Sequence, residues 1–278
     1  MSNKKNGAKK LSGQEGFDEY YGTLFGERWA ALRGALNSPV RYAEWNAGKK
    51  SYFLDSGSVR SASSLPLSGA KRILDMCAAP GGKSLVLASL MDYDAELFLN
   101  ERSFDRYKRL SRVIDEHLAD EKRSLVHLSC SDGATMCLRN PEPFDRILLD
   151  APCSSERHVL GDEKYLSKWS PSRIKMLSSA QWALLSSAFR MLNSGGLLVY
   201  STCALSEIEN DGVVRRVLKK FSDAKIILPP SAEELSILIS PFCKIELPFA
   251  ERTEFGFHVL PDSSDGAGPL YFSLISKS

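Results

Sequence analysis

The sequence predicts a doubly wound α/β fold, and three observations support this prediction. From residue 71 onward, short apolar runs of strand length alternate with amphipathic stretches of helix length. A glycine turn at Gly81-Gly82 joins the first apolar run to the first of these stretches. Acidic residues stand at the ends of three runs, at Asp75, Glu101 and Asp150. Ligands bind such sheets beyond the carboxyl ends of the strands, so we expect the functional site there.

The apolar runs and the helical periodicity locate the individual elements. We expect strands over residues 72–75, 97–101, 125–128, 146–150 and 197–200. A helix follows the glycine turn, and two longer helices are predicted over residues 103–118 and 172–192. Ser103 is the expected N-cap of the first long helix, and Gly195-Gly196 is the expected left-handed C-cap of the second.

Three stretches of different composition precede residue 71. Residues 1–14 are polar and lysine-rich, and we expect a disordered basic tail there. Residues 15–45 carry aromatic and apolar side chains at helical spacing, whereas residues 46–70 are rich in serine and glycine and are typical of a loop or linker. The predicted organisation is therefore a tail over 1–14, a small helical and linker segment over 15–70, and the main domain over 71–278.

Composition excludes several classes of protein. The 278 residues are 43% hydrophobic and 25% charged, as in ordinary soluble globular proteins, and no apolar run has the length of a membrane span. The N-terminus lacks the apolar stretch of a secretory signal, so we expect the cytoplasm, with the mitochondrial matrix as the alternative. None of the six cysteines forms a CxxC pair, and no histidine stands at zinc-ligand spacing from them, so we expect free thiols and no metal.

A net charge of only +2 means that any surface for nucleic acid must be a local basic patch. Two clusters are candidates, and a solvated face is the alternative for each. The clusters are Lys4, Lys5, Lys9 and Lys10 in the tail, and Arg106, Lys108, Arg109 and Arg112 at helical spacing.

The glycine turn and the acidic residue at 101 are typical of a nucleotide-type cofactor site. Glycines let the backbone approach a ligand, and the free N–H groups of a helix start favour an anionic group. The turn is not a P-loop, because Cys77 stands where that motif requires a glycine. Glu101 follows the glycines by about 20 residues, the spacing at which a carboxylate accepts ribose hydroxyls. The alternative for Glu101 is a solvated loop carboxylate.

Two cysteines follow the ends of two predicted strands. Cys153 ends the motif Asp150-Ala151-Pro152-Cys153, and Cys203 ends the motif Tyr200-Ser201-Thr202-Cys203. A single cysteine is more often a small buried side chain than a chemical group. If the two strands are neighbours, however, both thiols converge on one crevice, and this coincidence favours chemistry.

The stretches Asp75–Ser84, Asp150–Ser154 and Tyr200–Asn210 resemble the signature motifs of the Nop/Sun family of RNA cytosine-5 methyltransferases, which includes bacterial 16S ribosomal RNA enzymes. The resemblance covers roughly residues 70–278 and points to the short, single-domain members. It implies a Rossmann-like class I methyltransferase with a seven-stranded, mostly parallel sheet and helices on both faces. The ending Gly268–Phe272 is similar to the closing strand of that sheet. Ser84 stands where the family usually has threonine.

The resemblance also implies S-adenosylmethionine as the cofactor and a set of residues that bind it. The glycine turn and Lys83 would contact its methionine end, Glu101 its ribose and Asp132-Gly133 its adenine, with Arg106 as a supporting contact. Asp150 would face both the cofactor and the cytosine. The full implied cofactor set is Ala79, Pro80, Gly81, Gly82, Lys83, Glu101, Arg106, Asp132, Gly133 and Asp150.

The catalytic roles implied by the resemblance explain why two cysteines are present. The thiolate of Cys203 would add to carbon 6 of cytosine, which activates carbon 5 toward the methyl group. Asp150 would protonate or hydrogen-bond the ring nitrogen N3. Cys153 would assist release of the product, and Lys83 would favour the thiolate form of Cys203.

Several alternatives stay open at this stage. Ribosomal RNA is favoured over tRNA as the partner, and a catalytically silent RNA-binding assembly factor is a rival function. A DNA-type mechanism would instead make Cys153 the attacking group. Arg157 and His158 would contact RNA phosphate or the flipped base, or else are ordinary loop residues. Because about 70 residues precede the core, we expect target selection by the core surface, the N-terminal segment or a protein partner, and a monomeric protein.

Overall fold

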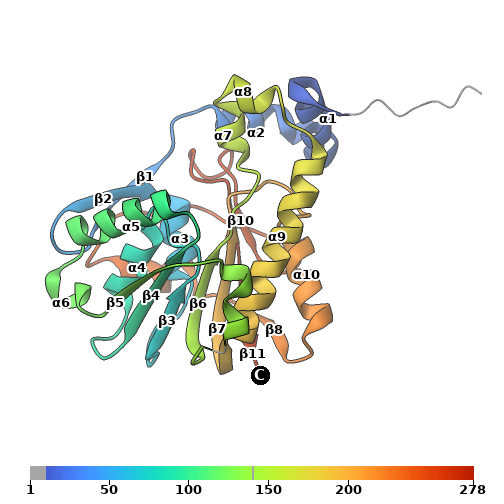
Figure 1. Ribbon diagram of the computed structural model, residues 1–278. Coiled ribbons are helices and arrows are strands. Elements are labelled where there is room, and N and C mark those ends of the chain that lie inside the picture. The colour runs from blue at the N-terminus through green and yellow to red at the C-terminus, as the bar shows by residue number, and fades with distance from the viewer. Residues whose placement is uncertain (1–10, 140) are drawn as a thin grey trace, which may run out of the picture.

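The computed structural model describes residues 11–139 and 141–278, and a central β-sheet with helices on both faces organises this part of the chain (Figure 1). The tail lysines Lys4, Lys5, Lys9 and Lys10 lie outside the described residues. Five parallel strands form one half of the sheet: β3 (Arg72–Asp75), β4 (Glu96–Glu101), β5 (Val126–Cys130), β6 (Phe144–Asp150) and β7 (Leu192–Thr202).

The parallel strands lie in the order β5-β4-β3-β6-β7. The chain therefore runs from β3 outward through β4 and β5, and then returns to the other side of β3 with β6. Register places Asp75 opposite Leu148 and Asp150 opposite Ser201. The strand order reverses between β3 and β6, and this reversal opens the crevice in which such sheets bind their ligands.

Antiparallel strands complete the other half of the sheet. β11 (Leu270–Lys277) pairs with β7, with β8 (Ala224–Ile227) and with β10 (Phe257–Val259), and β9 (Glu251–Arg252) pairs with β10. The predicted fold class and the closing strand near residue 270 are confirmed. The sheet formed by the described residues has nine strands, because β9 and β10 add two short strands to the seven predicted.

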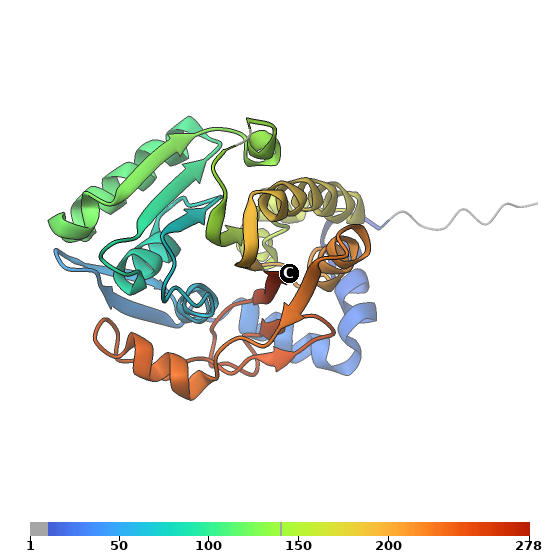
Figure 2. The ribbon, with the colours of Figure 1, turned by 90° about the horizontal axis from the view of Figure 1, so that it is seen from below.

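Helices cover both faces of the sheet (Figure 2). Each face has its own apolar core, because side chains along each strand alternate between the two faces. On β3, Ile73 points into the first core and Leu74 into the second. The first core also takes residues from α3 (Ser56–Ser63), α4 (Gly82–Leu90), α5 (Phe104–His117) and α11 (Ala232–Ile239). The second takes residues from η2 (Gly133–Arg139), α9 (Pro171–Arg190) and α10 (Asp211–Lys220).

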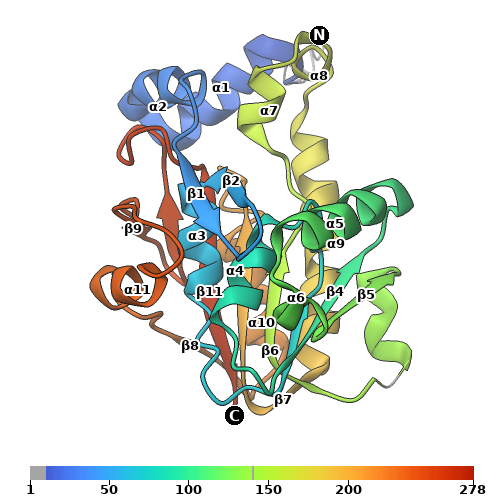
Figure 3. The ribbon, with the colours of Figure 1, turned by 90° about the vertical axis from the view of Figure 1, so that its left-hand side faces the viewer.

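The prediction of a loop or linker over residues 46–70 is wrong. Strands β1 (Tyr42–Asn46) and β2 (Ser51–Asp55) form an antiparallel hairpin that leads directly into α3 (Figure 3). The side chain of Asp55 caps α3 by accepting the backbone N–H of Gly57 at 2.7 Å. Serines along α3 are buried, since their small side chains let the helix pack closely on α4. Buried side chains from residues 43–70 therefore pack into the first core of the sheet.

The N-terminal helices form a third apolar cluster above the carboxyl ends of the parallel strands (Figure 1). Helix α1 (Gly13–Phe25), the 3-10 turn η1 (Gly26–Arg28) and α2 (Trp29–Leu36) pack against α7 (Glu156–Leu160) and α8 (Glu163–Leu166). Phe17 and Tyr21 are buried against Trp169 of the loop before α9, and Trp29 stacks on Tyr21. Helix α1 begins at Gly13, so residues 13 and 14, which the sequence assigned to the tail, belong to this helix.

The two long helices are confirmed as α5 and α9, and α6 (Asp120–Arg123) follows α5. Helix α9 ends at Arg190, however, and its C-cap is Met191. Gly195 does adopt a left-handed conformation, with φ of 75°, but it lies within β7, so the predicted glycine C-cap is wrong. In the part of the chain that the structure describes, no helix is long and apolar enough to cross a membrane.

Candidate active site

A cavity of about 570 Å³ opens at the carboxyl ends of β3, β6 and β7. One wall carries Lys83, Asp150, Cys153 and Cys203, and other residues come from the N-terminal hairpin and from 268–270. The cavity therefore lies where the strand ends predicted a site, and its volume suits a small-molecule ligand.

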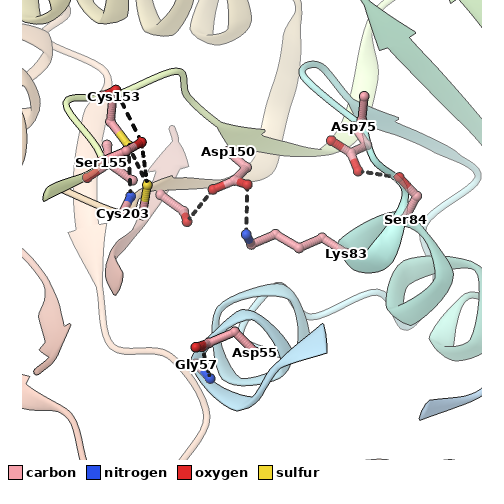
Figure 4. A network of polar contacts seen from close by, with 12 residues as sticks. Asp55, Gly57, Asp75, Lys83, Ser84, Asp150, Cys153, Ser155 and Cys203 are labelled. Carbon is pink, nitrogen blue, oxygen red and sulfur yellow. Dashed lines mark hydrogen bonds and ion pairs between the residues drawn. The ribbon is translucent and has the colours of Figure 1, made fainter. Parts of the chain in front are cut away.

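Register brings the two predicted thiols together. Strands β6 and β7 are parallel neighbours, and Cys153 and Cys203 follow their carboxyl ends. The two Sγ atoms lie 2.7 Å apart, and the backbone N–H of Cys203 donates to Sγ of Cys153 at 3.2 Å (Figure 4). The expected convergence of both thiols on one crevice is confirmed.

Ser155 joins the two thiols and was missed from the sequence. Its Oγ lies 3.2 Å from Sγ of Cys203 and 3.5 Å from Sγ of Cys153. The backbone of Ser155 is left-handed, with φ of 56° and ψ of 61°, which costs a non-glycine residue about 1–3 kcal/mol. This conformation turns the hydroxyl toward the thiols, where it can donate to a thiolate. A serine in a loop gives no sequence signal for such a turn.

The ion pair between Lys83 and Asp150 stands beside the thiols. Nζ of Lys83, from the first turn of α4, donates to Oδ2 of Asp150 at 2.7 Å, and Oγ of Ser201 donates to Oδ1 at 3.0 Å (Figure 4). Burial by itself would lower the pKa of Lys83. The negative charge of Asp150, together with smaller contributions from Cys203 and Asp75, instead raises the pKa above its ordinary value. Lys83 therefore remains a cation near Cys203.

The thiol of Cys153 is held in its protonated form. Its hydrogen bond with Cys203 and then its burial raise the pKa of Cys153 well above the ordinary value. A protonated Cys153 beside Cys203 can donate to a thiolate there. This geometry suits Cys203 better as the attacking sulfur.

The first motif forms the predicted strand, turn and helix start. Asp75 is fully buried at the end of β3 and accepts the hydroxyl of Ser84 at 2.7 Å, so serine in place of threonine keeps this bond. Burial raises the pKa of Asp75 to about 7. Gly81 has φ of 120°, and a Cβ there would stand 2.9 Å from a methyl group of Val113 on α5. The turn therefore needs glycine at this position.

Glu101, the residue predicted to bind a ribose, is buried and only partly hydrogen-bonded. It is 3% exposed at the end of β4, and its Oε1 accepts the backbone N–H of Ser103 at 2.8 Å. Oε2 is buried and has no hydrogen-bond donor in suitable geometry among the described residues, although Nη1 of Arg106 lies 3.2 Å away. The other guanidinium nitrogen of Arg106 donates to the carbonyl of Ala79 at 2.7 Å. A buried carboxylate oxygen that is ion-paired but accepts no hydrogen bond fits a ribose hydroxyl, so these residues suit S-adenosylmethionine.

The remaining predicted cofactor residues lie away from the thiols. Asp132 follows β5 and accepts the backbone N–H of Ala134, and Gly133 packs against Met76 and Leu184. Glu101, Asp132 and Gly133 do not line the cavity of the thiols. Pro80 and Gly82 line a smaller cavity of about 190 Å³, and Lys83 and Asp150 are common to both cavities. We call the part of the site that holds the predicted cofactor residues the cofactor end, and the part that holds Cys153 and Cys203 the thiol end. The two ends meet at the ion pair between Lys83 and Asp150.

The hairpin supplies wall residues that the linker prediction missed. Tyr42, 61% exposed, and Asp55 both line the cavity of the thiols. Arg157 and His158 line the same cavity, as the sequence suggested. Arg157 donates to the carbonyls of Ser38 and Gly266, at 2.9 Å each, and so ties the N-terminal segment to the loop before β11.

The strand order, the glycine turn after β3 and the acidic strand ends define the Rossmann-like class of S-adenosylmethionine-dependent methyltransferases. Solved structures agree. NSun6 from Pyrococcus horikoshii with SFG, a cofactor analogue, has a TM-score of 0.64 at 25% identity over 83% of this chain and 54% of that chain. A methyltransferase homolog protein from the same organism has a TM-score of 0.69 at 21% identity over 94% of each chain and supports the fold alone.

The family model described as 16S rRNA methyltransferase RsmB/F matches residues 62–257, and the chain belongs to this family. Ribosomal RNA small subunit methyltransferase F from Aeromonas salmonicida is 42% identical over 58% of this chain. The mitochondrial tRNA (cytosine(34)-C(5))-methyltransferase of Mus musculus is 32% identical over 82% of it. The chain spans 34% of the length of the first relative and 64% of the second.

Proposed function

We propose that the protein is an S-adenosylmethionine-dependent methyltransferase that methylates carbon 5 of cytosine in RNA. The observation that carries this proposal is the contact between the thiols of Cys153 and Cys203 beside Asp150. Two thiols at one site suit a reaction in which one sulfur adds to the base and a second group assists its release. Family membership and the named RNA substrates of both relatives support the proposal.

Each side chain has a distinct task in this reaction. Cys203 adds as a thiolate to carbon 6 of cytosine, and the hydroxyl of Ser155 and the charge of Lys83 stabilise that thiolate before attack. Asp150 takes a proton from the Lys83 ammonium and, as an acid, hydrogen-bonds or protonates N3, so that the ring can accept the electron pair displaced from the C5–C6 double bond.

S-adenosylmethionine, when bound, supplies the methyl group, and Gly81, Gly82, Glu101 and Arg106 would hold it, with Asp132 and Gly133 at its adenine. A water molecule then takes the proton from carbon 5, and the electron pair of that C–H bond re-forms the C5–C6 double bond. The bond between carbon 6 and Cys203 breaks, with its electron pair returning to the sulfur. Cys153, in contact with that sulfur, assists this release.

Ribosomal RNA is the favoured substrate, because the matched family and the bacterial relative both act on small-subunit ribosomal RNA by name. A tRNA cytosine is the second candidate, since the mouse relative that aligns with more of this chain acts on tRNA by name. A monomeric state, a protein partner for target selection and a cytoplasmic location, with the mitochondrial matrix as alternative, stay predictions.

Purified protein with methyl-labelled S-adenosylmethionine and either small-subunit ribosomal RNA or tRNA tests the proposal. We expect 5-methylcytosine in the digested ribosomal RNA, and none with Cys203→Ala. Cys130→Ala is the matched control, because Cys130 is exposed at the end of β5 and does not line the cavity. A methyl group on another atom, or full activity of Cys203→Ala, would contradict the proposed function. Cofactor binding without any transfer would favour the silent assembly factor.

A further inference from the structure

A buried pair of carboxyl groups that the proposed reaction does not use lies behind the two thiols. Glu156 is the first residue of α7, and Glu209 stands two residues before α10. Both side chains are fully buried, and neither lines the cavity. Oγ of Ser154 is in hydrogen-bond contact with Oε1 of Glu156 and with Oε2 of Glu209. The pair therefore cannot touch the substrate, but it contacts the residue next to Cys153.

The hydrogen bonds of the pair cross between the two cysteine loops. Glu209 follows Cys203 in the chain, yet its Oε1 accepts the backbone N–H of Ser154, next to Cys153, at 2.9 Å. Glu156 follows Cys153, yet its Oε2 accepts the backbone N–H of Leu205, two residues after Cys203, at 3.0 Å. Each loop is thus held by a carboxyl group from the other loop.

Counting hydrogens places one proton on the pair. The hydroxyl of Ser154 has a single hydrogen and can donate to only one of its two carboxyl neighbours, so the other contact needs a proton from a carboxyl group. On Glu156, Leu205 donates to Oε2 and the hydroxyl of Tyr21 donates to Oε1.

On Glu209, Oε1 already accepts two donors, the backbone N–H of Ser154 and Nε2 of Gln181, both at 2.9 Å. Oε2 contacts only the hydroxyl of Ser154, which can accept as well as donate. The proton therefore belongs on Oε2 of Glu209, with Ser154 donating onward to Glu156.

We propose that Glu156 and Glu209 are positioning residues that share one proton, carried by Glu209, and lock the loops of Cys153 and Cys203 at the separation that addition and release require. This inference rests on the proposed function of the two thiols. Burial raises the pKa of both carboxyl groups. The pKa of Glu209 rises to about 7, and the negative charge of Glu156 is the second cause of this rise. This direction agrees with a protonated Glu209. The titratable groups that face the pair are Cys153, Tyr20 and Tyr21 of α1, and Tyr200 of β7.

Tyr21 connects the N-terminal segment to this network. Its ring is buried between Phe17, Trp29 and Trp169, and its hydroxyl reaches Glu156 across 135 positions of sequence. Helix α1 thereby helps to fix the loop of Cys153. The N-terminal helices act as part of the thiol site, although they contribute no residue that reacts.

The separation of the two thiols can be measured without RNA or cofactor. Diamide takes one hydrogen from each thiol, becomes a hydrazine and leaves a Cys153–Cys203 disulfide, which peptide mapping identifies. Its rate in the full-length protein reports how well the two sulfurs are positioned. The informative pair of variants is Glu209→Gln and Glu156→Gln, which make the same exchange of an amide for a carboxyl group on the two sides of the pair.

The two variants should behave differently. In Glu209→Gln the amide NH₂ replaces the carboxyl O–H toward Ser154, so the oxidation rate should stay within about threefold of wild type. In Glu156→Gln an NH₂ group must face either Leu205 or Tyr21, both donors, so the rate should fall by about tenfold or more. Methyl transfer should follow the same order, with kcat lowered and KM for the RNA unchanged in Glu156→Gln.

Thermal unfolding of each variant checks that the fold is intact. If Glu156→Gln does not fold, Tyr21→Phe removes a single donor to Glu156 and should slow oxidation by a smaller factor, about threefold. An oxidation rate that is unchanged in Glu156→Gln and in Tyr21→Phe, or lowered equally by both glutamine substitutions, would overturn the proposal. If the variants show the expected pattern of oxidation but the wild-type protein methylates no cytosine, the proposed function is overturned and the positioning role is still supported.

Discussion

The two ends of the active cavity are built in different ways. At the cofactor end, several features come from neighbouring residues, such as the turn at Gly81-Gly82 or Glu101 with the N–H of Ser103. At the thiol end, the contacts join distant parts of the chain. Cys153 meets Cys203 across 50 positions, and Ser154 meets Glu209 across 55.

This difference has consequences for mutation. A substitution that removes one ligand contact from a local turn leaves the other hydrogen bonds of that turn in place. In the thiol network, one hydroxyl or carboxyl group serves several partners, so its removal leaves other buried groups unpaired. We therefore expect graded losses at the cofactor end and large losses at the thiol end.

The largest loss is expected at the ion pair where the two ends meet. Asp150→Asn keeps the shape of the side chain but removes the charge that faces Lys83 and the acid that serves N3. Methyl transfer in a single turnover at saturating cofactor should fall by about 10²–10⁴-fold. Asp94→Asn, at an exposed ion pair with Lys71, is the control. A loss of transfer under tenfold would remove Asp150 from the acid role.

The shared proton predicts a pH dependence of stability. Because the folded protein raises the pKa of Glu209 from 4.5 to about 7, folding is favoured by this group below pH 4.5, and the gain is lost as the pH rises through 7. The free energy of unfolding should therefore fall by about 3 kcal/mol more in wild type than in Glu209→Gln across that window. Asp75 changes stability in the same direction but is present in both proteins. Identical pH profiles in denaturant titrations would show that Glu209 carries no such proton.

The smallest of these effects is expected at the cofactor end. Glu101→Ala removes a buried, charged acceptor from the ribose position, so the affinity for S-adenosylmethionine should fall by about 1.5–3 kcal/mol. Isothermal calorimetry measures this loss directly. Glu96→Ala serves as the control, since Glu96 is half-exposed at the opposite end of the same strand. If Glu101→Ala binds the cofactor as tightly as wild type does, Glu101 does not contact the ribose.

Sequence predicts those parts of this molecule that depend on local pattern. Apolar runs located β3, β4, β6 and β7, and the residues after β6 and β7 identified both cysteines before any register was known. The helix start at Gly82 followed from the glycines, and its bond between Ser84 and Asp75 is local as well.

What the sequence could not supply depends on packing between distant segments. Serine is common in linkers, but it is also small enough to bury in a tightly packed helix, and this second property decides α3. No local sequence pattern distinguishes Glu156, Glu209 and Tyr21 from ordinary helix and loop residues. Their role in holding the two cysteine loops follows only from their burial beside one another. Gly195 illustrates the same limit, because its left-handed conformation serves β7 and not the end of α9.

A trapping experiment tests most directly whether Cys203 attacks and Cys153 releases. Each alanine variant is incubated with labelled RNA and S-adenosylmethionine, and the products are separated on a denaturing gel. Cys153→Ala should still attack but fail to release, so a protein–RNA complex that survives denaturation should accumulate, whereas Cys203→Ala should give none. A complex that accumulates with Cys203→Ala and not with Cys153→Ala would contradict this division and make Cys153 the nucleophile, as in the DNA-type mechanism.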